Sequence, residues 1–205
     1  MASLSQAKIL GEVGSILVVL AAIPTVGGLL GIVGFILLLI AVKDISDYVG
    51  DKSIFNNMLI SVGAAIVGLI VGVFVVLGSV INVLVNNGMM GYNPSVSNIP
   101  QSQWMSLIGP ALAAFAILWV ALIVSAVFVR RSYSSIAEKL NIGMFRTAGL
   151  IYIIGAATAI ILIGFVLILV AQILLIIAFF SIPENPPPAQ TSPPPPPSST
   201  TASTI

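Results

Sequence analysis

The chain of 205 residues is 59% hydrophobic and only 6% charged, whereas soluble domains carry about 25% charged residues. This composition excludes an ordinary water-soluble domain and predicts an integral membrane protein whose main partner is the lipid bilayer. The net charge of +1 offers no basic field for nucleic acid. The absence of cysteine and histidine excludes disulfides, thiol chemistry and imidazole-based catalysis or metal binding.

The first apolar run, from Val13 to Val42, has no charged residue and is too long for one membrane span but short for two. Pro24 removes a backbone hydrogen-bond donor and restricts the residue before it, and a pair of glycines follows at residues 27 and 28. A turn is therefore favoured there. We predict a helical hairpin over residues 9–42, with helices over about residues 4–23 and 28–48.

Two full spans follow, over residues 58–85 and 105–129. The second long run, residues 147–182, again exceeds one span, and Gly164 is its best candidate for a break between two helices. The predicted fold is an all-α membrane protein with six transmembrane helices, in which two short helical hairpins flank two full spans. The alternative is that the hairpins of residues 9–42 and 147–182 are re-entrant, because arms of about 14–15 apolar residues suit either arrangement.

The positively charged residues mark one side of the membrane. They fall in two linkers, residues 43–57 and 130–146, and at Lys8 near the N-terminus. Positive charge favours the cytoplasmic side. With six spans, both linkers and both termini lie on that side, so we expect a multi-pass protein of the cell membrane with cytoplasmic termini.

The two charged linkers resemble each other. Ile54-Phe55-Asn56 aligns with Met144-Phe145-Arg146, and Ile45-Ser46-Asp47 aligns with Ile136-Ala137-Glu138 after a one-residue gap. The match indicates a parallel helix–linker–helix duplication, as in transporter folds; chance similarity in a biased composition is the alternative. Apolar residues on one face of each linker also predict helix extensions at the membrane interface, which are either a lipid or partner surface or ordinary connectors.

The composition changes abruptly after Ile182, where a proline-, serine- and threonine-rich segment begins. Such a segment has too few apolar residues to offset the entropy of ordering. We therefore predict a disordered cytoplasmic tail over residues 183–205, beside a helical transmembrane domain over residues 1–182. The tail is either a docking segment for a tail-binding protein or a solubilising extension.

Few residues offer chemistry at membrane depth. No nucleotide-binding loop occurs, and the serines of the spans have no histidine or intramembrane lysine to activate them. We predict no enzymatic activity and no catalytic, cofactor-binding or metal-binding residues. The candidate intramembrane polar residues are Glu12, Gln172 and Asn82. Glu12 can pair with Lys8, the two amides can form interhelical hydrogen bonds, and their convergence would mark a substrate pathway.

Small residues recur every fourth position in the third helix, at Ala64, Gly68 and Gly72. Residues at this spacing share one helix face, where a neighbouring backbone can approach closely. The face is predicted to pack against another helix, either of the same chain or of a second copy.

Two stretches carry a family resemblance: IVGFILLLIAVKDISDYVGDKSIFNNMLIS (residues 32–61) and MFRTAGLIYIIGAATAIILIGFVLILVAQILLIIAFFSI (residues 144–182). They resemble an uncharacterised, mainly archaeal family of multi-spanning membrane proteins, the domain of unknown function 996. The resemblance leaves out the proline-rich tail. It implies an integral protein of an archaeal plasma membrane, and it implies no catalytic or binding residues.

Two functional hypotheses follow. The first is a non-enzymatic structural or scaffolding membrane protein that binds a membrane protein, a second copy of itself or a tail-binding protein. The second is a small transporter or channel built on the helix–linker–helix repeat. A continuous polar cavity would favour transport, and a filled apolar core would favour scaffolding.

Overall fold

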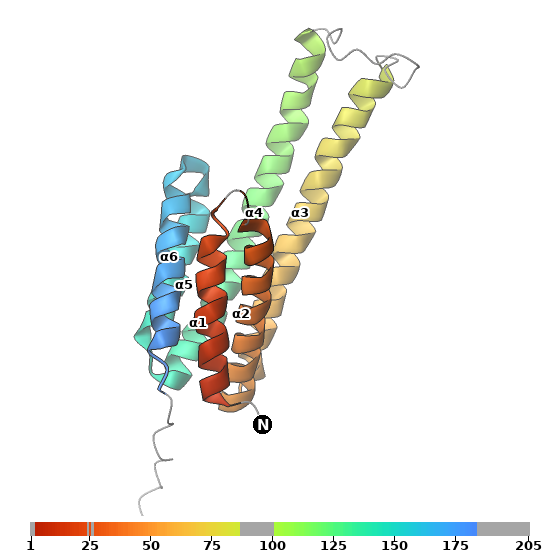
Figure 1. Ribbon diagram of the computed structural model, residues 1–205. Helices are drawn as coiled ribbons and strands as arrows, with labels where there is room; N and C mark the ends of the chain where they lie inside the picture. Colours follow the sequence, from red (N-terminus) through yellow and green to blue (C-terminus); the bar gives the residue numbers. More distant parts are fainter. Residues whose placement is uncertain (1–2, 24, 26, 87–100, 184–205) are drawn as a thin grey trace, which may run out of the picture.

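The computed structural model describes residues 3–23, 25, 27–86 and 101–183, and the regular structure in these ranges is helical. The predicted outer loop and nearly all of the predicted tail lie outside the described residues. The elements, in chain order, are α1 (Leu4–Leu20), α2 (Gly27–Val49), α3 (Lys52–Asn86), α4 (Gln101–Leu140), α5 (Gly143–Ala157), the short 3-10 helix η2 (Ala159–Ile161) and α6 (Ile163–Phe180) (Figure 1).

The first apolar run turns back on itself. Ser3 caps the start of α1, since its Oγ accepts a hydrogen bond from the Gln6 N–H at 3.2 Å. The helices α1 and α2 lie side by side and antiparallel (Figure 1), as the proline and glycines predict. Their backbones touch at two glycines: a Cβ on Gly34 would lie 2.7 Å from the Gly14 carbonyl oxygen, and one on Gly14 would lie 2.8 Å from the Gly34 oxygen.

The second long run also folds into a hairpin, but the predicted break at Gly164 is wrong. The chain turns earlier, over residues 158–162, and Gly164 already belongs to α6. A side chain on Gly164 would collide with the backbone of Ala159 and with the Gly155 oxygen. The glycine is thus explained by close packing of α6 on α5, whereas Leu162 adopts the positive φ of 24° in the turn.

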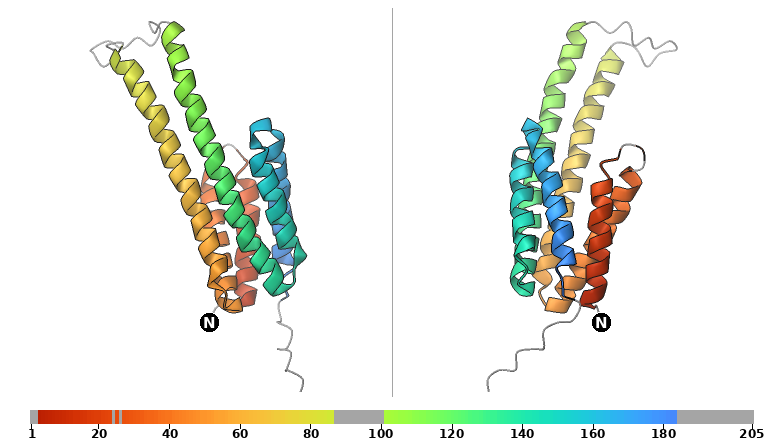
Figure 2. Two further views of the ribbon diagram at one scale, coloured as in Figure 1. Left: turned by 180° about the vertical axis from the view of Figure 1, so that it is seen from behind. Right: turned by 60° about the vertical axis from the view of Figure 1, so that its left-hand side comes forward.

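The six helices form a ring in chain order. Each helix packs against the next, and α6 packs back against α1. The two hairpins cover only one end of the α3–α4 pair, which continues well beyond them (Figures 1 and 2). Helix lengths of 35 and 40 residues for α3 and α4 correspond to about 52 and 60 Å, whereas α1 and α5, with 17 and 15 residues, measure about 26 and 22 Å.

The main hydrophobic core lies inside the ring at its charged end, where the N-terminus and both short linkers are found (Figure 1). All six helices contribute to it. Phe145 and Phe179, both fully buried, meet edge to face, with ring centroids 5.1 Å apart and an interplanar angle of 85°. Tyr133 packs on the other side of Phe145 at 6.2 Å. The other buried members are Leu4, Ala7, Leu38, Ala41, Val42, Ile45, Ile54, Met58, Val129, Ile136, Ala137, Ala148, Leu175, Ala178 and Ile182.

Four helices in the described part of the chain are long and apolar enough to cross a membrane: α2, α3, α4 and α6. The helix α5 is apolar but shorter, and α1 has 17 residues. Large apolar side chains are exposed along these helices, among them Leu29 at 75% and Phe74 at 71%. Such a surface is suited to lipid, which identifies a membrane-embedded protein.

Candidate functional site: the charged end of the ring

The two short linkers at the charged end have the same backbone geometry. Each first helix ends in one residue of left-handed conformation, Gly50 with φ 71° and Asn141 with φ 55°. The N–H of the following residue, Asp51 or Ile142, then donates a hydrogen bond to the carbonyl five residues earlier, at 3.0 Å in both linkers. This is the hydrogen bond of a Schellman-type helix end, where glycine and asparagine are favoured.

The linkers therefore correspond at a constant offset of 91 residues, from 50 to 141 and from 51 to 142. At this offset, the fully buried Ile45 and Ile54 match the fully buried Ile136 and Phe145. The one-residue gap of the sequence alignment is wrong, because that alignment paired Phe145 with Phe55, which is only partly buried. What repeats is the pattern of burial: the α2–linker–α3 and α4–linker–α5 segments are equivalent, as a helix–linker–helix duplication predicts.

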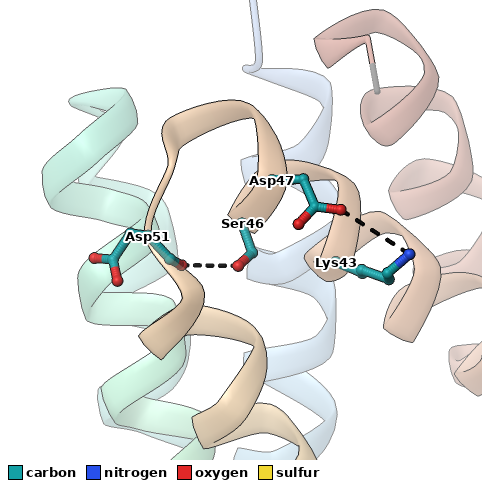
Figure 3. A network of polar contacts seen from close by, with 4 residues as sticks. All are labelled: Lys43, Ser46, Asp47 and Asp51. Carbon is teal, nitrogen blue, oxygen red and sulfur yellow. Dashed lines mark hydrogen bonds and ion pairs between the residues drawn. The ribbon is translucent and has the colours of Figure 1, made fainter. Parts of the chain in front are cut away.

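Hydroxyl groups fix the linkers in place. Ser46 Oγ donates to the carbonyl oxygen of Asp51 at 2.7 Å across the first linker (Figure 3). Ser132 Oγ, on α4 and fully buried, donates to the Ile54 oxygen at 2.9 Å and so joins α4 to the start of α3. Sequence reasoning missed both serines. The signal for Ser132 was available, since at the offset of 91 residues it corresponds to the fully buried Ala41.

Asp51 acts as the N-cap of α3. Its Oδ1 accepts a hydrogen bond from the Ser53 N–H at 3.0 Å, the arrangement that satisfies an otherwise unpaired donor in the first helical turn. Hydrogen bonds from Ser53 lower the pKa of the Asp51 carboxyl, so it is ionised at neutral pH. The nearby Lys43–Asp47 ion pair is long, at 4.0 Å, and exposed (Figure 3), so it contributes little to stability.

The amphipathic faces of the linkers are not free surfaces. Ile45 and Ile136 are fully buried, and Tyr133 and Ala137 are 5% and 6% exposed. These side chains belong to the core of the ring. The interpretation of these faces as a lipid or partner surface is therefore wrong, because the neighbouring helices cover them; Tyr48, at 40% exposed, is an exception.

Two of the candidate polar residues lie on helices that pack together. Glu12 is on α1 and Gln172 is on α6, and these helices are in contact. In the described residues, the buried Oε1 atoms of both side chains have no hydrogen-bond partner. The expected interhelical hydrogen bond is therefore not made by Gln172 Oε1, and the Lys8–Glu12 ion pair stays a prediction.

Asn82 is separated from the other two candidates. It is exposed near the far end of α3, in the part that neither hairpin reaches (Figure 1), and it lines a hollow with Ser79 and Pro110. The three polar residues therefore do not converge on one pathway. Within the described residues, no group of His, Cys, Asp and Glu is placed to hold a metal ion.

The small-residue positions lie between α3 and α4. A Cβ on Gly68 would collide with that of Ala121, and one on Gly72 would lie 3.1 Å from Leu118. One turn closer to the charged end, the hydroxyls of Ser61 and Ser125 form a buried hydrogen bond of 2.8 Å. Ala64 is only partly buried and lines a groove outside the contact.

Replacing Gly68 with leucine is expected to force α3 and α4 apart, because Ala121 has no flexible atoms that can move aside. The cost should be about 1–3 kcal/mol, as for other overpacked sites, measured by thermal or denaturant unfolding in detergent. Gly78→Leu is the matched control on the same helix, where a Cβ would meet nothing within 4 Å. Equal stability of the two variants would show that the α3–α4 contact is not tight at Gly68.

Comparisons with known proteins agree with this architecture. A family model described as "Protein of unknown function (DUF996)" matches residues 30–173, which run from α2 to α6 and include both linkers. Uncharacterized protein MJ1644 of Methanocaldococcus jannaschii is 30% identical over 170 residues, covering 83% of this chain and 88% of the relative. No solved structure matches the chain. Since the family model covers most of the chain, the predicted resemblance is confirmed, and the chain belongs to the DUF996 family.

Proposed function

We propose that the protein is a non-enzymatic scaffold of the cell membrane, which holds partner proteins at the cytoplasmic surface. The filled core supports this proposal. Side chains of all six helices meet inside the ring at the charged end, among them the fully buried Phe145, Phe179, Ile45 and Ile136. A solute path along the ring would have to displace this packed cluster, whereas a scaffold gains rigidity from it.

The test is to recover the full-length protein from its native membrane in mild detergent and to identify what accompanies it. The expected result is a reproducible set of proteins, part of which is lost when residues 184–205 are removed. Recovery of a small solute without any protein partner would overturn the proposal. The tail truncation distinguishes a tail-binding partner from one that binds the helices.

A small transporter or channel is the second candidate, and the α1–α6 contact favours it. Glu12 and Gln172 each keep a buried Oε1 without a partner in the described residues, and unpaired polar atoms at membrane depth are costly unless they serve a function. Vesicles containing the purified protein and a pH-sensitive dye would reveal proton or cation flux. Flux that Glu12→Gln abolishes would establish this function in place of the scaffold.

The positive charges support cytoplasmic placement of both termini. The start of α1, both short linkers and the end of α6 lie at one end of the ring (Figure 1), together with all basic residues of the described chain. This placement holds whether or not the hairpins span fully, because each hairpin begins and ends on the same side. The α3–α4 connection then lies on the opposite side.

We favour re-entrant hairpins over six full spans. The arms α1 and α5, about 26 and 22 Å long, fall short of a hydrocarbon core of about 30 Å. The tip of the second hairpin is apolar and exposed, with Ile161 at 68% and Leu162 at 81%. Such side chains are unfavourable in water, which supports a tip that ends within the hydrocarbon.

Single-cysteine labelling tests this topology cleanly, because the chain contains no cysteine. Cysteines at Ser3 and Lys139 should react with an impermeant thiol reagent only from the cytoplasmic side, and a cysteine at Gly91 only from outside. A cysteine at Leu162 should be protected from both sides. Outside labelling at Leu162 would establish a full span, and outside labelling at Ser3 would reverse the orientation.

A further inference from the structure

The outer face of the α3–α4 pair carries an apolar groove of about 800 Å³, lined by these two helices alone. On α3, the lining residues Gly63 and Val67 lie on the opposite helix side from Ile54 and Met58, which enter the core. The groove therefore faces away from the ring. Seen from behind, α3 and α4 lie in front of the hairpins (Figure 2, left).

The floor of the groove is open at Gly63, where a Cβ would meet nothing within 4 Å. Its sides include Val67 and Val120, which are 60% and 54% exposed. These positions belong to the spanning parts of α3 and α4. In a bilayer the groove is therefore open to hydrocarbon chains.

A polar hollow of about 530 Å³ continues this face toward the charged end. Along α4, Val120 and Val124 of the groove are followed by Val127 and Arg131 of the hollow, a spacing of four, three and four residues that keeps one helix face. The hollow is further lined by Asn57, Arg130, Ser134, Ser135 and Ile153.

The two arginines supply unneutralised positive charge. Neither forms an ion pair with a carboxylate in the part of the chain that the structure describes. The Arg131 guanidinium lies over the Phe128 ring at 5.4 Å, and the stem of Arg130 lies beside Gly149 of α5. Both guanidiniums are thus positioned at the membrane-interface end of an apolar groove.

We propose that the groove and the hollow form one binding site for an anionic phospholipid of the cytoplasmic leaflet. Arg130 and Arg131 bind the phosphate of the headgroup, with hydrogen bonds from Ser134, Ser135 and Asn57. One hydrocarbon chain of the same lipid occupies the groove beside Gly63. The charge at one end and the apolar lining at the other fit a lipid, since free phosphate would leave the groove empty and an apolar helix would leave the guanidiniums unpaired.

The test measures the affinity of the detergent-purified full-length protein for phosphatidylglycerol and for phosphatidylcholine with identical acyl chains. Arg130→Gln with Arg131→Gln should weaken phosphatidylglycerol binding about thirtyfold, equivalent to about 2 kcal/mol at 1.4 kcal/mol per tenfold. Lys43→Gln with Lys52→Gln removes the same charge outside the hollow and should change the affinity less than about twofold.

Gly63→Leu fills the groove without touching the arginines and should weaken phosphatidylglycerol binding about tenfold, because it excludes the chain at the cost of about one well-packed side chain. Gly109→Leu, where a Cβ also meets nothing within 4 Å, is its control. Equal affinity for the two lipids, or for the wild type and the arginine variant, would overturn the site. Weakening by the arginine variant alone would also overturn it, because the groove would then hold no chain, and competition by inorganic phosphate at equal affinity would identify a simple anion site.

Discussion

Phe145→Ala is expected to lower the free energy of unfolding by about 3 kcal/mol, at the lower end of the range for buried phenylalanines. Phe145 is fully buried and touches both Phe179 and Tyr133, so its removal leaves a cavity where α4, α5 and α6 meet. The lower end of the range applies because lipid, unlike water, solvates an exposed ring well, and the loss is mainly one of packing. Unfolding of the purified protein in mixed detergent, followed by circular dichroism, measures it.

Phe74→Ala is the control for this change, because Phe74 is 71% exposed on the part of α3 that the hairpins leave uncovered. Its removal should change stability by less than about 0.5 kcal/mol, as for other exposed sites. If both variants lose the same stability, the core at the charged end is not what holds the ring together.

Gly34→Leu should separate the arms of the first hairpin and cost about 3 kcal/mol, at the top of the overpacking range. A Cβ at Gly34 would lie 2.7 Å from the Gly14 oxygen and 2.8 Å from the Val18 nitrogen. Backbone atoms cannot move aside as a side-chain end can, so the helices themselves must shift. The readout is again the unfolding transition in detergent.

Gly28→Leu is the matched control on the same helix, since a Cβ there would meet nothing within 4 Å. It should leave the transition within about 0.5 kcal/mol of the wild type, because an exposed side chain adds no strain. A control variant as unstable as Gly34→Leu would mean that leucine disturbs α2 through helix formation or insertion, and that the glycine contact is not the cause.

The helices could be read from the sequence because their signals are local. The turn after α1 follows from Pro24 and the two glycines, and the predicted second helix, from residue 28 to 48, differs from α2 by one residue at each end. The second hairpin was harder, since its turn at residues 158–162 contains neither glycine nor proline. Gly164 gave the stronger signal, although its glycine serves contact with α5.

The candidate sites show the same division. The sequence identified Glu12, Gln172 and Asn82 as rare polar groups, but their mutual placement depends on which helices become neighbours. Conversely, Arg130 and Arg131 were assigned only to topology, because the groove that ends beside them needs both α3 and α4 to exist. A property of two helices cannot be read from one.

The sequence alone determined that this protein lives in lipid, that it is helical, and which end carries the positive charge. Those properties follow from composition and from spacing along one chain segment. Only the tertiary structure decided the closure of the ring by α6 against α1, the constant 91-residue register of the two linkers and the limited reach of the two hairpins. The reason is that these features depend on contacts between residues far apart in the chain, where small side chains allow backbones to meet and buried ones fill the space between them.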